Sequence, residues 1–190
     1  MKKNGFTLIE LLAVITILAI TAIIVIVKID KNIKDTQDFA DDMQIKNIEN
    51  AALTYSSTYI DEIVDFNTKK VGTITVSTLI DKGILKKKDV DSIPVTNNIL
   101  ICEINGDIKV KYLESLKNVI FLIGPSSMSL YVNDTYKEMG AYVAIPSTGL
   151  VKLSDSNISS NLNTSATGSY DVTYSYDNAD SIKRIVEIIN

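Results

Sequence analysis

The feature that most constrains this chain is an unbroken apolar stretch over residues 6–27. It is 22 residues long and contains one ionisable side chain, Glu10, close to its beginning. At about 1.5 Å per residue a helix of that length extends roughly 33 Å, which matches the hydrocarbon thickness of a bilayer. No other apolar run in the chain approaches this length, so the sequence predicts a single transmembrane helix.

The carboxylate of Glu10 needs a cationic partner, because an acidic group at mid-membrane costs about 2.5–3.5 kcal/mol and somewhat less near the helix end. Lys2 and Lys3 lie in the short polar head before Gly5. Cleavage between Gly5 and Phe6 would create an α-amino group four residues from Glu10, on the same face of the helix. In a bundle, the amine of one copy could then neutralise the carboxylate of its neighbour.

The basic head Lys2-Lys3-Asn4-Gly5, followed by Phe6-Thr7-Leu8-Ile9-Glu10, resembles the class III signal of type IV pilins and of the related pseudopilins. The resemblance implies that a prepilin peptidase cuts after Gly5 and that the new terminal Phe6 is N-methylated. It also implies that Glu10 helps to dock each subunit into a growing fibre. Many family members end the apolar run with a proline, where this chain has Val27.

Two plainer interpretations of the N-terminal segment are an ordinary secretory signal and an uncut membrane anchor. A secretory signal has an apolar region of about 7–15 residues and a cleavage site of small residues. Neither is present here, since Lys28-Ile29-Asp30-Lys31 follows the run. An uncut anchor explains the length of the run but does not explain why the acidic Glu10 lies within it.

Charge and residue usage exclude several classes of function. The formal net charge is −4, and no part of the chain is strongly basic, so a nucleic-acid partner is not expected. The one basic run, Lys86-Lys87-Lys88, is expected to be a solvated turn. Histidine is absent and Cys102 is the single cysteine, which removes most metal-ligand, thiol and triad chemistry. We therefore expect no enzymatic activity, no cofactor and no metal.

Three further residue sets have a functional and a structural interpretation. Cys102 lies in an apolar strand and is expected to be a buried thiol, with an intermolecular disulfide as the alternative. Loop acids could bind Ca²⁺, but their spacing fits no calcium loop and a solvated role is favoured. Alternating tyrosines could form a binding face, although alternation favours core packing. The loop acids are Asp155, Asp177 and Asp180, and the tyrosines are Tyr170, Tyr174 and Tyr176.

Beyond Val27 the helical pattern continues, because no glycine or proline occurs before Gly72. Apolar and aromatic residues recur at intervals of three and four with charged residues between them, as in an amphipathic helix. One helix is therefore predicted from Phe6 to about Tyr59 or Glu62. Its second half is expected to pack on a small globular head.

The head is predicted to contain a small antiparallel sheet. Residues 72–76 alternate like a strand, and Ser77 is the expected N-cap of a short helix over 78–82 that ends at Gly83. Residues 98–104 and 107–113 flank Asn105-Gly106, a strong hairpin signal. In the second hairpin strand Ile108, Val110 and Tyr112 are expected to face the core, and Lys109 and Lys111 the solvent.

From Asn118 onward the sequence predicts an all-β module, with strands at 119–123, 129–132, 141–145, 168–177 and 182–189. Several of its motifs resemble bacterial immunoglobulin-like repeats of surface proteins. The motifs are Gly124-Pro125, Tyr131-Val132-Asn133-Asp134-Thr135-Tyr136, Met139-Gly140-Ala141 and Gly168-Ser169-Tyr170-Asp171-Val172-Thr173-Tyr174, and the basic Lys183-Arg184-Ile185-Val186 also fits. The resemblance implies a small immunoglobulin-like sandwich.

The predicted fold class is α+β: a long transmembrane and amphipathic helix with a small antiparallel sheet, followed by an all-β immunoglobulin-like sandwich. The predicted segments are a leader at 1–5, the membrane half of the helix at 6–27, a pilin-like domain at 28–117 and the sandwich at 118–190. The favoured function is a minor pilin, anchored in the cytoplasmic membrane and then assembled into an extracellular pilus. Its expected partners are prepilin peptidase, other pilin subunits and a surface ligand of the C-terminal module. The alternatives are a pseudopilin of a secretion or DNA-uptake machine and an anchored surface protein that never polymerises.

Overall fold

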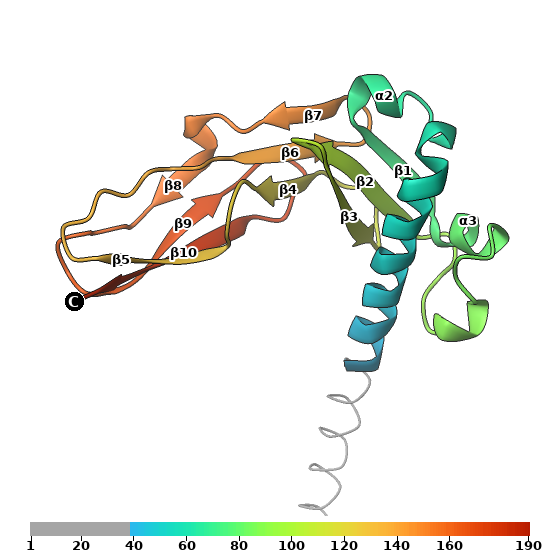
Figure 1. Cartoon of the computed structure of the whole chain (residues 1–190), viewed down its shortest axis with the longest axis horizontal. Helices are drawn as coiled ribbons and strands as arrows, with labels where there is room; N and C mark the ends of the chain where they lie inside the picture. Colours follow the sequence, from blue (N-terminus) through green and yellow to red (C-terminus); the bar gives the residue numbers. More distant parts are fainter. Residues whose placement is uncertain (1–38) are drawn as a thin grey trace, which may run out of the picture. The chain divides into compact units, whose positions relative to one another are not determined.

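A computed structural model describes residues 39–190, which form an α+β structure (Figure 1). The predicted membrane half of the helix, at 6–27, lies outside the described residues. Residues 39–59 are helical, and Ile45–Asn190 form one compact unit. The elements after this helix are η1 Ile60–Glu62, α2 Phe66–Lys69, β1 Val71–Thr75, α3 Val76–Asp81, η2 Lys87–Asp89, β2 Asn98–Ile104, β3 Asp107–Leu113, β4 Val119–Leu122, β5 Ser127–Tyr131, β6 Ala141–Ile145, β7 Gly149–Lys152, η3 Asp155–Asn157, β8 Ile158–Ser160, β9 Gly168–Tyr174 and β10 Ile182–Ile189.

The described helix packs through one apolar stripe, as its amphipathic pattern predicts. Ile48 and Ala52 are fully buried and Tyr55 nearly so. They share a cluster with Ile99 and Ile101 of β2, so this stripe covers one face of the sheet β1-β2-β3. The helix ends at residue 59 and continues as the 3₁₀ turn η1, close to the predicted end. Among residues 39–190, no helix combines the length and apolar character needed to cross a membrane.

The β2–β3 hairpin has the predicted bounds. Asn105 and Gly106 both have positive φ angles, 55° and 88°, which a tight two-residue hairpin turn requires. The strands pair antiparallel from Ile104↔Asp107 to Asn98↔Leu113. Alternation along β3 places its apolar side chains on the helix side and leaves its lysines exposed, so the predicted facing is confirmed.

The predicted N-cap of the short helix is wrong. The cap is Thr75, not Ser77, and α3 starts at Val76. The hydroxyl Oγ1 of Thr75 accepts the backbone N–H of Thr78 at 3.4 Å, while its own backbone is still extended. Strand β1 therefore ends one residue earlier than predicted, and Ser77 lies in the first turn of α3. The basic run Lys86-Lys87-Lys88 is exposed around η2, as predicted.

The residues after Asn118 form two sheets, ordered β4-β6-β7 and β5-β10-β9-β8. Val143 of β6 and Val172, Tyr174 and Val186 of the other sheet lie in one buried cluster. Burial of Tyr174, with Tyr170 and Tyr176 packed against the same cluster, confirms the prediction that these tyrosines serve the core.

Several predicted strand bounds differ from the structure. Strands β7 and β8 were absent from the sequence-based prediction, because each is only three or four residues long and lacks strong alternation. Strand β9 ends at Tyr174 rather than at 177, because Tyr174 is the last residue that pairs with β10 and β8. Strand β5 begins at Ser127, two residues before the predicted start, where it pairs in parallel with β10.

Candidate functional site

The predicted processing and assembly residues, Gly5, Phe6 and Glu10, lie outside the described residues. Their roles therefore remain predictions from the sequence. The described part of the chain adds two features with functional potential: a surface cleft beside β3 and a buried polar network in the C-terminal sheets.

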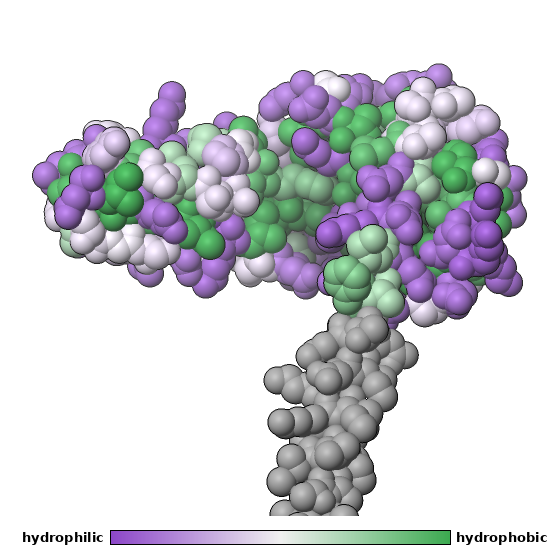
Figure 2. All heavy atoms as spheres, turned by 60° about the horizontal axis from the view of Figure 1, so that its bottom comes forward, coloured by the Kyte–Doolittle hydropathy of each residue, from purple (hydrophilic) through white to green (hydrophobic). Residues whose placement is uncertain are grey.

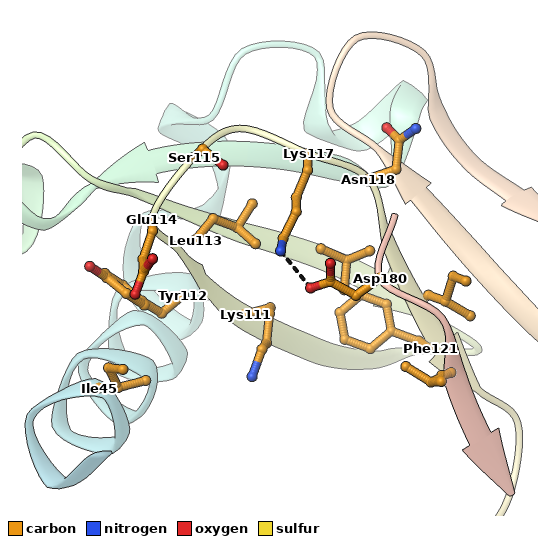
Figure 3. Close-up of a pocket in the computed structure, with 13 residues that line it drawn as sticks. Ile45, Lys111, Tyr112, Leu113, Glu114, Ser115, Lys117, Asn118, Phe121 and Asp180 are labelled. Carbon is orange, nitrogen blue, oxygen red and sulfur yellow. Dashed lines mark hydrogen bonds and ion pairs between the residues drawn. The ribbon is translucent and has the colours of Figure 1, made fainter. Parts of the chain in front are cut away.

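The cleft has a volume of about 610 Å³, within the range of about 300–1,000 Å³ that is typical of ligand sites (Figure 3). It lies between the end of β3, the connection 114–118 and the beginnings of β4 and β10. A hydrophobic area is visible on the surface where these elements meet (Figure 2). The lining residues are Ile45, Lys111, Tyr112, Leu113, Glu114, Ser115, Lys117, Asn118, Val119, Ile120, Phe121, Asp180 and Ile182.

One wall of the cleft is held by the connection between β3 and β4. The ammonium of Lys117 forms an ion pair with Asp180, which Figure 3 shows across the opening. Asn118 donates its backbone N–H to the carbonyl of Asn178 at 2.9 Å and its side-chain amide to the carbonyl of Asp177 at 2.8 Å. These contacts tie the connection to the loop before β10, and they give Asp180 an ion-pairing role.

The other wall is held by Glu49 of the helix. Its carboxylate accepts the backbone N–H of Tyr112 at 3.1 Å and lies 3.5 Å from the ammonium of Lys111. The cleft thus combines apolar side chains with charged ones, of which Lys111, Lys117 and Asp180 are paired. Such a surface can bind a partner, and no nucleophile with an adjacent base lines it. Within residues 39–190, no three acidic or thiol side chains gather in a way that could hold a metal.

A buried arginine organises the second feature. Arg184 of β10 is fully buried, and its Nε donates to the carbonyl of Pro125 at 2.9 Å. Its Nη1 donates to the hydroxyl of Tyr174 at 2.7 Å and to the carboxylate of Glu138 at 3.1 Å. Further bonds from the guanidinium reach the carbonyl of Ile123 and the hydroxyl of Tyr136.

Glu138 is the acceptor at the centre of this network. Oε1 of its carboxylate accepts the hydroxyl of Tyr174 at 2.6 Å and the backbone N–H of Gly140 at 2.6 Å. Burial alone would raise the pKa of Glu138, but the bonds from Tyr174, Tyr136 and Gly140 and the charge of Arg184 together lower it below its usual range. Burial and the bond to Glu138 raise the pKa of Tyr174. The carboxylate is therefore kept ionised and the phenol neutral.

This network was not predicted, although the sequence contains a signal for it. Along β10, Arg184 shares its alternation with Val186 and Ile188, which are buried, while Lys183 and Glu187 lie on the other face. A charged residue in phase with core positions indicates a buried ion pair. Because no buried side-chain nitrogen or oxygen of this network lacks a hydrogen-bond partner, we interpret the network as a structural clamp on the segment 123–140.

Cys102 is fully buried in β2 and has no disulfide partner. Burial raises the pKa of its thiol to about 12, so the reactive thiolate form is strongly disfavoured. The prediction of a buried thiol is confirmed.

Comparison with protein families gives two matches. Residues 1–26 match the model of the prokaryotic N-terminal methylation motif, and residues 120–188 match the model of the bacterial surface protein, Ig-like domain. A search of curated proteins found no match to the chain. The first match contains Gly5, Phe6 and Glu10 and indicates type IV pilin-like or pseudopilin-like processing, which implies a prepilin peptidase and other pilins as partners. The second match fits a role at the cell surface. The chain thus has a pilin-like signal in its N-terminal segment and a surface-type β region in its C-terminal segment.

Proposed function

We propose that this protein is a minor pilin-like structural subunit of a type IV pilus. The observation that carries the proposal is the methylation motif at residues 1–26, with Gly5 before the cut, Phe6 after it and Glu10 in the apolar run. Processing by prepilin peptidase supplies the positive terminus that a carboxylate at this depth requires. The chain is then a single-pass protein of the cytoplasmic membrane before assembly and an extracellular protein after it.

The described head supports a subunit role. A helix that buries one stripe on an antiparallel sheet is the arrangement that the resemblance to pilins implies. In the described cleft, the pairs Glu49–Lys111 and Lys117–Asp180 are structural, and the apolar side chains beside them suit a binding surface. We therefore propose no catalytic role for residues 39–190.

The C-terminal β region is proposed to be an immunoglobulin-like sandwich that contacts a surface ligand, an adhesion partner or the end of the fibre. Two sheets that share one core, together with the family match over residues 120–188, support this part of the proposal. The extra bulk of these roughly 70 residues favours a minor or tip position over a major subunit.

Two other assignments share parts of this support. A pseudopilin of a secretion or DNA-uptake machine has the same N-terminal motif. A membrane-anchored surface protein that does not polymerise is favoured by the surface-type match of residues 120–188. The first is distinguished by the machine with which the protein co-purifies, and the second by its absence from sheared surface fibres.

The test begins with the N-terminus of the mature protein. Mass analysis of full-length protein from cells with prepilin peptidase is expected to show loss of residues 1–5 and one methyl group on Phe6. Gly5→Val should leave the anchored precursor, whereas Asn4→Ala, the neighbouring control, should be processed. An intact leader in fibre-associated protein would refute processing.

The second arm tests assembly. Glu10→Gln removes the charge but preserves the shape of the side chain, so membrane insertion should persist while recovery in sheared fibres falls at least about tenfold. Thr7→Ser, within the same segment, serves as the control. If the Gln variant enters fibres as efficiently as the control, the charge-pairing argument is wrong.

A further inference from the structure

Strand β2 is apolar on both of its faces. Ile99 and Ile101 face the helix, whereas Leu100, Cys102 and Ile104 face the opposite side of the sheet and are also buried. The neighbouring strand β3 behaves differently, because its second face carries exposed lysines. The sheet β1-β2-β3 therefore needs a cover on its second face, over β1 and β2.

That cover is the sheet β4-β6-β7. Ala144 of β6 is fully buried in the same cluster as Leu100 and Cys102, and Phe121 of β4 and Leu150 of β7 pack against it. Strand β6 is likewise buried on both faces, because Val143 points into the core shared with β9 and β10. Each sheet thus buries an apolar face that would otherwise be exposed.

The contact also brings backbone against backbone. A Cβ atom at Gly149, the first residue of β7, would lie 2.7 Å from the carbonyl oxygen of Lys69 in α2. The φ angle of Gly149 is +121°, which L side chains rarely adopt. Glycine is therefore required at this point both by its backbone conformation and by the close approach of α2.

The connection between the two sheets leaves little freedom. It consists of residues 114–118, which follow β3 directly, and its C-terminal end is held through the Lys117–Asp180 ion pair and the two bonds of Asn118 to the loop before β10. A flexible tether would have free polar groups and no buried contact on either side.

We infer that the C-terminal β region is the structural cover of the pilin-like sheet, and that residues 45–190 fold and move as one body. The C-terminal β region is then not a separate module joined to the head by a flexible hinge. A load applied to β4, β6 or β7 passes into β2 through the apolar contact, and any ligand bound by the C-terminal strands keeps a fixed orientation to the described head. The inference does not depend on whether the protein enters a pilus.

The buried thiol supplies a direct test, because Cys102 is the single cysteine and lies in this contact. Full-length protein in detergent is treated with a thiol reagent over a series of urea concentrations. In the wild-type protein, labelling of Cys102 is expected to have the same urea dependence as global unfolding followed by circular dichroism. Fast labelling in native buffer with a shallow urea dependence would show a hinged module and overturn the inference.

Two matched pairs of variants localise the effect. Leu150→Asp places a charge in the contact, whereas Val151→Asp makes the same change at the next, partly exposed residue of β7. Gly149→Ala adds a Cβ against α2, whereas Gly83→Ala adds one at another glycine of positive φ, +69°, with open space around it. The first member of each pair should label at least about tenfold faster than its control.

If Leu150→Asp unfolds the whole chain while Val151→Asp does not, the result supports joint folding, because Leu150 lies outside the core of the C-terminal sheets. Equal labelling rates within both pairs would overturn the inference. The inference would also be overturned if Cys102 became accessible to the thiol reagent in Leu150→Asp while the urea unfolding of the C-terminal sheets stayed unchanged.

Discussion

Replacing Arg184 with methionine tests whether the buried network stabilises the C-terminal sheets. Methionine fills much of the same volume, but five hydrogen bonds are lost, including those to the carbonyls of Ile123 and Pro125. Glu138 keeps the bonds from Tyr174 and Gly140, yet it loses the only cation that contacts it in the described structure. Removing one partner of a fully buried ion pair typically costs about 3–5 kcal/mol, and because 29% of the Glu138 side chain is exposed we expect the lower end, about 3 kcal/mol.

That cost is large beside the total stability of a domain, about 5–15 kcal/mol. With a urea dependence of about 2 kcal/mol per molar, the midpoint of unfolding should fall by about 1.5 M. Urea titration of the full-length protein, followed by tyrosine fluorescence, measures the shift, since the chain has 9 tyrosines and no tryptophan. Tyr174 lies next to the altered position and reports on it directly.

The control is the neighbouring Lys183→Met. Lys183 is exposed and pairs with Asp171 at 2.7 Å, a kind of contact worth about 0.2–1 kcal/mol. Adding Glu138→Gln to Arg184→Met removes the unpaired charge while keeping an acceptor, so the double variant should be more stable than Arg184→Met alone. If Arg184→Met costs no more than Lys183→Met, the network is not a clamp and the interpretation fails.

Three further predictions follow from local geometry. In Gly72→Ala the new Cβ would lie 2.1 Å from Cγ2 of Ile63, so the variant should lose about 1–3 kcal/mol in urea unfolding, and the same substitution should cost less when it is made in an Ile63→Ala background. Thr75→Ala removes the observed cap and should cost about 1 kcal/mol, whereas Ser77→Ala should cost clearly less; the reverse order would restore the sequence-based cap. Because the pKa of Glu138 is lowered in the folded state, its contribution is complete above the unfolded pKa of about 4.5 and is lost as pH falls further. The urea midpoint of Glu138→Gln should therefore depend less on pH below that value than the wild-type midpoint, and parallel curves would contradict the assignment.

The hairpin was predictable because its signals are local. Asn105-Gly106 fixes a turn that few other dipeptides allow, and the alternation in β3 fixes which side chains face the helix. The burial of Cys102 was predictable for the same reason, since apolar neighbours on both sides mark a strand interior. In each case the residues that determine the structure are adjacent in sequence.

The errors concern choices that tertiary contacts decide. Threonine and serine are both good N-caps, so the residue type does not decide between Thr75 and Ser77. Strand β1 pairs with β2 as far as Thr75↔Asn98, and the helix begins directly after it, which makes Thr75 the cap. The short strands β7 and β8 have little intrinsic preference, and each exists because a longer neighbour, β6 or β9, offers a pairing edge. Two partners of Arg184 are far away in the sequence: Glu138 is separated from it by 46 residues and Ile123 by 61. No local sequence pattern encodes contacts at such separations.

The most informative missed signal is the composition of β2 itself. Its sequence, Asn98-Ile99-Leu100-Ile101-Cys102-Glu103-Ile104, is almost continuously apolar, whereas β3 alternates. A sheet with a helix on one side and solvent on the other produces alternation in every strand, so an unbroken apolar strand indicates a second covering layer. Because β4, β6 and β7 supply that layer here, removing the C-terminal region would expose Leu100, Cys102 and Ile104 to water. The C-terminal region is therefore tied to the sheet β1-β2-β3 by the same hydrophobic effect that holds the helix to that sheet, whether or not the protein enters a fibre.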